Sequence, residues 1–155
     1  MAASKLIYIF LALIACGYQV QAETRPTAKF FVVDNGVTVS CRDVAMNETG
    51  VVNGVHYTKR TKELITNDNA QTTCTGGIMD MSSLFSFSPF NGNISTRDTS
   101  QVTTMGNIFL YAQKFNQSIG SWDTSSVIDM WDMCNSAVDF NHDISNWDTS
   151  KVTSM

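Results

Sequence analysis

The sequence pattern Phe-Asn-x-x-Ile-x-x-Trp-Asp-Thr-Ser-x-Val-x-x-Met recurs at a fixed interval in the second half of this 155-residue chain. It begins at Phe90, Phe115 and Phe140, so both intervals are 25 residues. A fixed period between about 20 and 50 residues is typical of architectures in which each unit buries its apolar face only against its neighbours. The sequence therefore predicts an array of stacked units rather than one central core.

The recurring side chains are expected to build the units rather than to bind ligands, although Trp122 and Trp147 could instead form an aromatic binding stripe. In place of the tryptophan of later units, the first unit has Arg97, which suggests a partly buried position there. The recurrent Asp could supply oxygen ligands to Ca²⁺, but an Asp followed by Thr-Ser more simply caps a local turn. The recurrent Asn is expected to point inward and bond backbone groups. The predicted structural positions are Phe90, Asn91, Ile94, Asp98, Val102, Met105, Phe115, Asn116, Ile119, Trp122, Asp123, Val127, Met130, Phe140, Asn141, Ile144, Trp147, Asp148, Val152 and Met155.

Apolar spacing within a unit predicts a short helix. Val102, Met105, Phe109 and Ala112 lie three or four residues apart, and the Asp-Thr-Ser before them offers N-cap chemistry. The run 115–122 predicts a short strand, although the strand could instead lie at the Ser-x-Val-x-x-Met step. The expected fold class is an α/β repeat solenoid, leucine-rich-repeat-like, with a short strand and a short helix per 25-residue unit.

A small β-rich cap is predicted before the array, over residues 30–76. β-Prone runs flank Asp34-Asn35-Gly36, and another run contains Asn53-Gly54, both of which are hairpin signals. Residues 59–69 are expected to form a short helix. The array itself is assigned to residues 77–155, with units from about 77, 90, 115 and 140, and the last unit is interpreted as truncated, as in a fragment.

The first 22 residues are interpreted as an export signal. Lys5 precedes an apolar stretch over 6–15 that is too short to span a bilayer as a stable helix. Cleavage after Ala22 would leave residues 23–29 as a polar tether, whereas a lipobox reading would make Cys16 the lipidated first residue. Both readings predict a secreted or cell-surface protein, attached to a membrane only through that possible lipid anchor.

Cys41 and Cys74 are the predicted disulfide of an oxidising compartment. Cys134 stands where earlier units have Phe and is expected to be a buried small hydrophobe. No metal or other cofactor is predicted, because the chain has no Cys-x-x-Cys pair and its two histidines are isolated.

Charge and residue types argue against nucleic-acid binding and catalysis. From Thr75 onward, three cations stand against eight Asp. Such an acidic segment lacks the clustered Lys and Arg that phosphate or anionic lipid requires. No nucleophile elbow or phosphate loop is present, so the chain is predicted not to be an enzyme.

The phrases at 115–127 and 144–155 resemble the repeats of BspA-like bacterial surface proteins, which have a similar length. Similar repeats occur in mycoplasma- and Listeria-type lipoproteins whose domain has no assigned function. The resemblance implies a leucine-rich-repeat-like solenoid at the cell surface, with adhesion or protein binding and no catalytic residues.

The predicted function is non-catalytic binding of an extracellular protein or glycan through one face of the array. The alternative is a structural envelope component that acts as a spacer without a specific ligand. Repeat proteins usually place recognition at positions that differ between units. The partner-binding candidates are therefore Leu110, Tyr111, Lys114 and Trp131.

Overall fold

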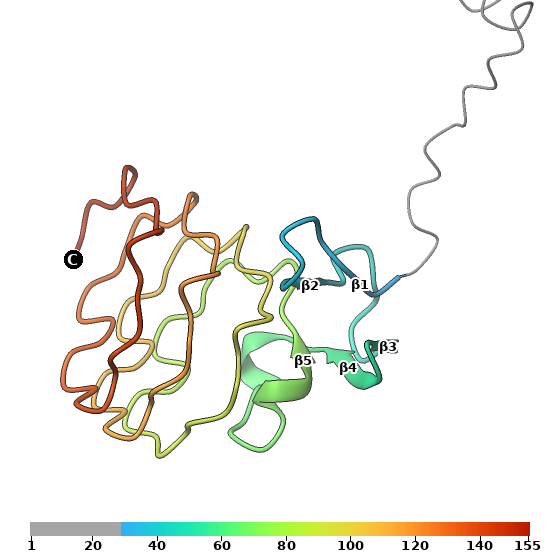
Figure 1. The fold of residues 1–155 in the computed structure, drawn as a ribbon, viewed down its shortest axis with the longest axis horizontal. Helices are drawn as coiled ribbons and strands as arrows, with labels where there is room; N and C mark the ends of the chain where they lie inside the picture. The colour runs from blue at the N-terminus through green and yellow to red at the C-terminus, as the bar shows by residue number, and fades with distance from the viewer. Residues whose placement is uncertain (1–28) are drawn as a thin grey trace, which may run out of the picture.

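The computed structural model describes residues 29–155. The predicted export signal, the lipidation candidate Cys16 and the tether up to residue 28 lie outside the described residues. A cap with short strands stands at one end of the molecule, the repeat segment follows it, and the C-terminus lies at the far end (Figure 1). No helix in residues 29–155 has the length and apolar character needed to cross a membrane.

The cap contains all the regular strands of the described chain. Two antiparallel hairpins form where the two Asn-Gly pairs predict them. In the second hairpin the turn residues Asn53 and Gly54 both have positive φ, at 50° and 79°, as a tight two-residue turn requires. The strands are β1 (Phe31–Val32), β2 (Val39–Ser40), β3 (Thr49–Val52), β4 (Val55–Lys59) and β5 (Thr73–Cys74), with β5 parallel to β4.

The prediction of an α/β, leucine-rich-repeat-like solenoid is wrong. No helix of seven or more residues occurs in the described part of the chain, and the segment does not close into a regular solenoid. The helix expected over 59–69 is also absent. Within that range the chain has one three-residue 3-10 turn, η1 (Lys62–Leu64), and a second, η2 (Ala70–Thr72), directly follows it. The regular structure is that of a small β-rich domain.

Left-handed residues explain why the apolar spacing did not produce helices. Two positions of each unit have positive φ: Asn107 and Tyr111 in one unit lie at 58° and 54°, and Asp132 and Ser136 in the next at 51° and 60°. An α-helix needs negative φ at every residue. Successive i to i+3 turns replace it, as in the bonds from Ile108 to Met105 and onward. Such turns bring apolar side chains to one side every three or four residues, as a helix would.

Neighbouring units of the repeat segment lie side by side in parallel register. Single-residue bridges join Asp80 to Thr104, Thr104 to Asp129, and Asp129 to Ser154. These residues directly precede the recurrent Met, so pairing occurs at the Ser-x-Val-x-x-Met step. The extended run 115–122 forms no strand.

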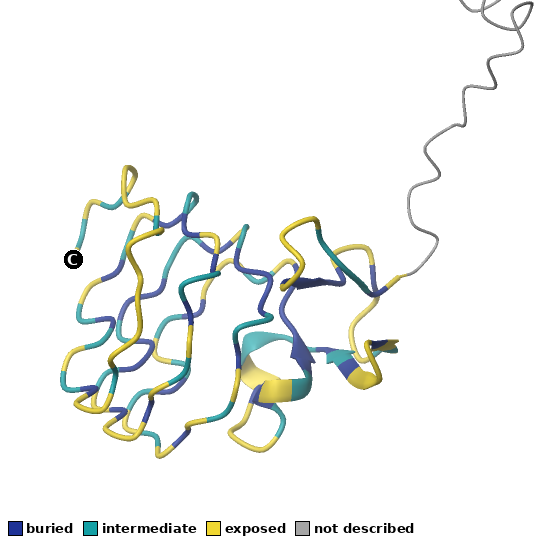
Figure 2. Cartoon of the chain, in the orientation of Figure 1, coloured by how far each residue is buried: buried dark blue, intermediate teal, exposed yellow. Residues whose placement is uncertain are grey.

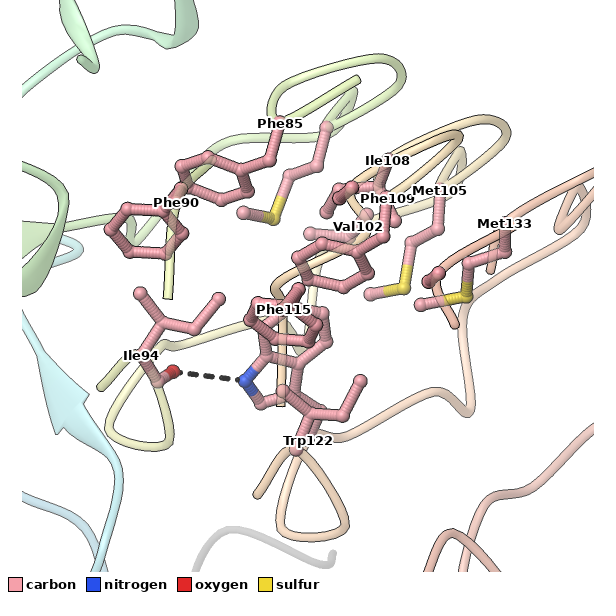
Figure 3. Close-up of a cluster of buried hydrophobic side chains, with 14 of the residues drawn as sticks. Phe85, Phe90, Ile94, Val102, Met105, Ile108, Phe109, Phe115, Trp122 and Met133 are labelled. Carbon is pink, nitrogen blue, oxygen red and sulfur yellow. Dashed lines mark hydrogen bonds between the residues drawn. The ribbon is translucent and has the colours of Figure 1, made fainter. Parts of the chain in front are cut away.

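Two apolar cores are present, one within the cap and one in the repeat segment, and the second also takes in Ile65 and Ala70 of the cap. Phe rings from consecutive turns stack within it: Phe109 and Phe115 have centroids 3.8 Å apart, and Phe85 and Phe90 4.3 Å apart (Figure 3). Buried residues occur in the repeat segment up to Ala137, whereas residues 138–155 at the C-terminal end are exposed or half-buried (Figure 2).

Candidate functional site

The recurrent apolar and Thr side chains of the units that begin at Phe90 and Phe115 are buried, and the Thr side chains bond one unit to the next. Thr99 Oγ1 donates to the Asp123 carbonyl over 3.0 Å, and Thr124 Oγ1 repeats the bond to Asp148 over 3.1 Å. The Asp side chains act locally, because each accepts from the backbone N–H two residues later. The recurrent apolar positions are buried in the first two units and less so in the last, where Ile144 and Met155 are exposed.

The recurrent Asn side chains lie outside rather than inward. Asn91, Asn116 and Asn141 are all exposed. The Asn91 side-chain oxygen accepts the backbone N–H of Asn116 over 2.8 Å, and that of Asn116 accepts the N–H of Asn141 over 3.1 Å. These side-chain amides therefore bond backbone groups, as expected. The backbone groups belong to the following unit, however, and the bonds lie at the surface.

The tryptophan position belongs to the core. Trp122 is buried and donates its Nε1–H to the Ile94 carbonyl over 3.1 Å (Figure 3). The partly buried Trp147 repeats the bond to Ile119. Arg97, expected to be only partly buried, is 3% exposed. Its Nη1 and Nη2 have no hydrogen-bond partner among the described residues, and burial lowers its pKa to about 9.

An ion pair joins the cap to the first unit. Arg42 Nε lies 3.0 Å from Asp98 Oδ2, and Ser40 Oγ contacts the same oxygen over 3.3 Å. Burial acts to raise the pKa of Asp98, but hydrogen bonds from Arg42 and Ser100 outweigh it and lower that pKa overall. Asp98 therefore bonds the first unit to the cap, whereas its counterparts Asp123 and Asp148 are exposed.

The cysteines divide into a bonded pair and one free thiol. Cys41 and Cys74 are both buried and form a disulfide that ties β5 to the segment after β2. Cys134 is free and half-buried, and burial raises its pKa to about 11. A thiol with a raised pKa is a poor nucleophile near neutral pH.

The predicted partner-binding residues do not form one cluster. Leu110 is half-buried, and Lys114 is exposed with its Nζ 3.5 Å from Asp139. Trp131 is exposed but stacks on no other aromatic ring of residues 29–155. Tyr111 is exposed and lies against Phe87.

Phe87 and Tyr111 form an exposed aromatic pair on consecutive units. Their ring centroids are 5.1 Å apart with an interplanar angle of 11°, and the side chains are 70% and 47% exposed. Sequence reasoning missed Phe87, although it lies 24 residues before Tyr111, the offset of the shorter first unit. The next unit has Ser136 at this position, so the aromatic row ends at Tyr111.

No candidate metal centre is present in the part of the chain that the structure describes. No group of three or more His, Cys, Asp or Glu there could hold a metal ion. A cavity of about 440 Å³ opens at the C-terminal end of the repeat segment. It is lined by Met130, Asp132, Met133, Cys134, Asn135, Ile144, Trp147, Thr149 and Met155.

Comparison with known proteins gives a family without an assigned activity. No curated protein and no solved structure matches the chain. A family model matches residues 57–155, which include the end of β4, all of β5 and every repeat unit. The chain belongs to the family described as Mycoplasma protein of unknown function, DUF285.

Proposed function

We propose that this is an exported, non-catalytic surface protein of the BspA-like kind. Its repeat segment binds an extracellular protein or glycan through the exposed face that carries Phe87 and Tyr111. The observation that carries the proposal is the aromatic pair itself, at a position where the fold does not require an aromatic residue.

Backbone geometry makes the choice of aromatic residues there costly. Phe87 and Tyr111 have φ of 55° and 54°, a region that bulky side chains rarely adopt. Such a conformation costs on the order of 1–3 kcal/mol per residue. Ser136 has the same φ region in the next unit, so a small polar residue satisfies the fold. Large exposed rings held at this cost are typical of a binding surface, where Tyr and other aromatics dominate the energetics.

The stacked rings also offer a pre-ordered surface. Because Phe87 and Tyr111 already lie against each other, little side-chain entropy is lost when a partner covers them. Over the repeat segment as a whole, acidic residues outnumber basic ones, which favours a partner that is neutral or basic over nucleic acid. The spacer alternative requires no such exposed aromatic row.

The test replaces both rings with Asn, which tolerates positive φ. Binding of the fluorescently labelled purified protein would be measured on a printed glycan panel and on intact cells. The double variant Phe87→Asn/Tyr111→Asn should lose at least tenfold in binding while its melting temperature is unchanged or higher. Leu64→Asn, which removes an exposed apolar side chain of the cap, should bind as the natural protein does.

Two results would overturn the proposal. Absence of binding by the natural protein on both surfaces would favour a spacer. Equal binding by the double variant and the Leu64→Asn control would show that the aromatic pair has no role in recognition.

A further inference from the structure

The surface row that begins with Phe87 and Tyr111 continues at Ser136 in the next unit. The three residues have the same backbone conformation, with φ of 55°, 54° and 60°. Their hydrogen bonds to the following chain segment also match. The N–H of Phe87 donates to the Leu110 carbonyl over 2.7 Å, and that of Tyr111 donates to the Asn135 carbonyl over 2.9 Å. Ser136 is therefore set against Tyr111 as Tyr111 is set against Phe87.

The small side chain of Ser136 leaves space beside one ring face of Tyr111. Phe87 covers the other face, because the two rings lie at an interplanar angle of 11° with their centroids 5.1 Å apart. Applied once more, the same repeat relation would stack a third ring on Tyr111, but the hydroxyl group of Ser136 takes that place. The space therefore has room for one planar group, and it results from the side chain of Ser136.

A chain of hydrogen bonds connects this space to a carboxylate. Ser136 Oγ donates to Asn135 Oδ1 over 2.9 Å, and Asn135 Nδ2 donates to Asp132 Oδ1 over 2.9 Å. Asp132 makes no ion pair with any of residues 29–155. It is half-buried, as is its counterpart Asn107, which has a following unit packed on it. This position therefore lies at the surface inside the array as well.

We infer that the space binds an arginine side chain of a partner protein. The inference rests on the proposed function and assigns the partner to proteins rather than glycans. A guanidinium is planar, stacks on aromatic ring faces and donates hydrogen bonds to carboxylates. It would stack on the free face of Tyr111 and donate to Asp132. The charge of the repeat segment is complementary, since eight Asp stand against three cations from Thr75 onward.

Other side chains and sugars match only part of this arrangement. A pyranose ring can stack on Tyr111, but a neutral sugar gains no charge interaction with Asp132. A lysine ammonium can pair with Asp132, but it is a point charge without a plane that would fill the space beside the ring. Arginine combines the plane with the positive charge.

The experiment titrates the purified protein with the tripeptide acetyl-Gly-Arg-Gly-amide and follows the NMR signals of the Tyr111 ring. Peptides with lysine or citrulline in place of arginine are the comparisons, because lysine keeps the charge and citrulline keeps the plane. The arginine peptide should shift the ring signals saturably, with a Kd lower by about fivefold than that of either comparison peptide.

Two variants test the two parts of the space. Ser136→Tyr fills it with a ring, and Asp132→Asn removes the charge, so each should weaken binding of the arginine peptide by about fivefold. Ser118→Tyr and Asp123→Asn make the same changes at other exposed positions and should leave binding unchanged. Melting temperatures of all four variants establish that they are folded, and Asp132→Asn keeps the test valid if the added tyrosine prevents folding.

Equal binding of the arginine, lysine and citrulline peptides would overturn the inference. Arginine binding that persists in both Ser136→Tyr and Asp132→Asn would also overturn it. Binding to the glycan panel that depends on Phe87 and Tyr111, without any response to the arginine peptide, would refute the inference but keep the proposed function. Cell and glycan binding that is independent of both rings would refute the proposed function as well.

Discussion

The indole Nε1 of Trp122 donates a hydrogen bond to the carbonyl oxygen of Ile94, 28 residues earlier, over 3.1 Å. Trp147 makes the same bond to Ile119. A recurrent aromatic side chain thus bonds the backbone of the unit before it, as well as filling the core. The unit that begins at Phe90 lacks this bond, because Arg97 occupies the position of the tryptophan.

Trp122→Phe should destabilise the protein by about 1–3 kcal/mol, since it removes a buried hydrogen bond and some core volume. Trp147→Phe removes the same bond from a partly buried ring at the exposed end and should cost less. Urea denaturation of both variants measures the difference. Equal losses would contradict the idea that the bond depends on burial.

Arg97→Met should stabilise the protein by about 1–3 kcal/mol, because a buried guanidinium without partners is replaced by an apolar side chain of similar length. The lowered pKa of Arg97 means that the folded chain binds fewer protons than the unfolded chain from about pH 9 up to the ordinary pKa of an arginine. The contribution of this group to stability therefore rises with pH in that window.

Thermal melts of Arg97→Met, beside Arg42→Met as the control, test this expectation. Arg42 is paired with Asp98, so its replacement should be destabilising. Loss of stability in Arg97→Met as large as in Arg42→Met would mean that the Arg97 guanidinium has a partner in solution.

Asp98→Asn should cost about 1.5–3 kcal/mol near neutral pH, because hydrogen bonds to a buried charged group are lost. The folded pKa of Asp98 is lowered, so its stabilisation is present above the ordinary value of 3.8 and is lost as pH falls through the folded pKa. The natural protein should therefore lose more stability below pH 3.8 than Asp98→Asn does. Asp123→Asn, at an exposed site with no ion pair among residues 29–155, serves as the control for denaturation by acid.

Reduction of the Cys41–Cys74 disulfide should destabilise the protein by about 3–4 kcal/mol, because the bond restricts an unfolded loop whose ends are 33 residues apart. Melting of the double variant Cys41→Ser/Cys74→Ser measures the loss. Cys134→Ser is the matched control, since Cys134 is free. A melting temperature that is insensitive to reductant in the natural protein would contradict the expectation.

Gly120→Ala should cost about 1–3 kcal/mol, because the added Cβ would meet the backbone oxygen of Asp143 at 2.5 Å. Gly106→Ala provides a comparison, since there the nearest atom, at 3.1 Å, belongs to the flexible side chain of Asp129. Chemical denaturation should rank the Gly120 variant as clearly the less stable one. The reverse order would show that neighbouring units shift more easily than their side chains.

The sequence predicted the cap hairpins but not the conformation of the repeat units. The turn at Asn53-Gly54 is a local property of two residues, so a short stretch was enough to place it. The expected helix after Val102 failed because consecutive turns with left-handed residues at Asn107 and Tyr111 give the same three- or four-residue apolar spacing. The periodicity of apolar residues shows which side chains share a face, but it does not distinguish an α-helix from a series of such turns.

By itself, the sequence determined the period, the side chains that fill the core and the family to which the chain belongs. These follow from local composition and from the interval between identical residues. Only the tertiary structure decided that Phe87 lies against Tyr111, and that the Arg97 guanidinium is buried with no hydrogen-bond partner for its Nη1 and Nη2 among residues 29–155. Each of these depends on how one unit is set against the next, and that register is fixed by backbone hydrogen bonds between residues about 25 positions apart.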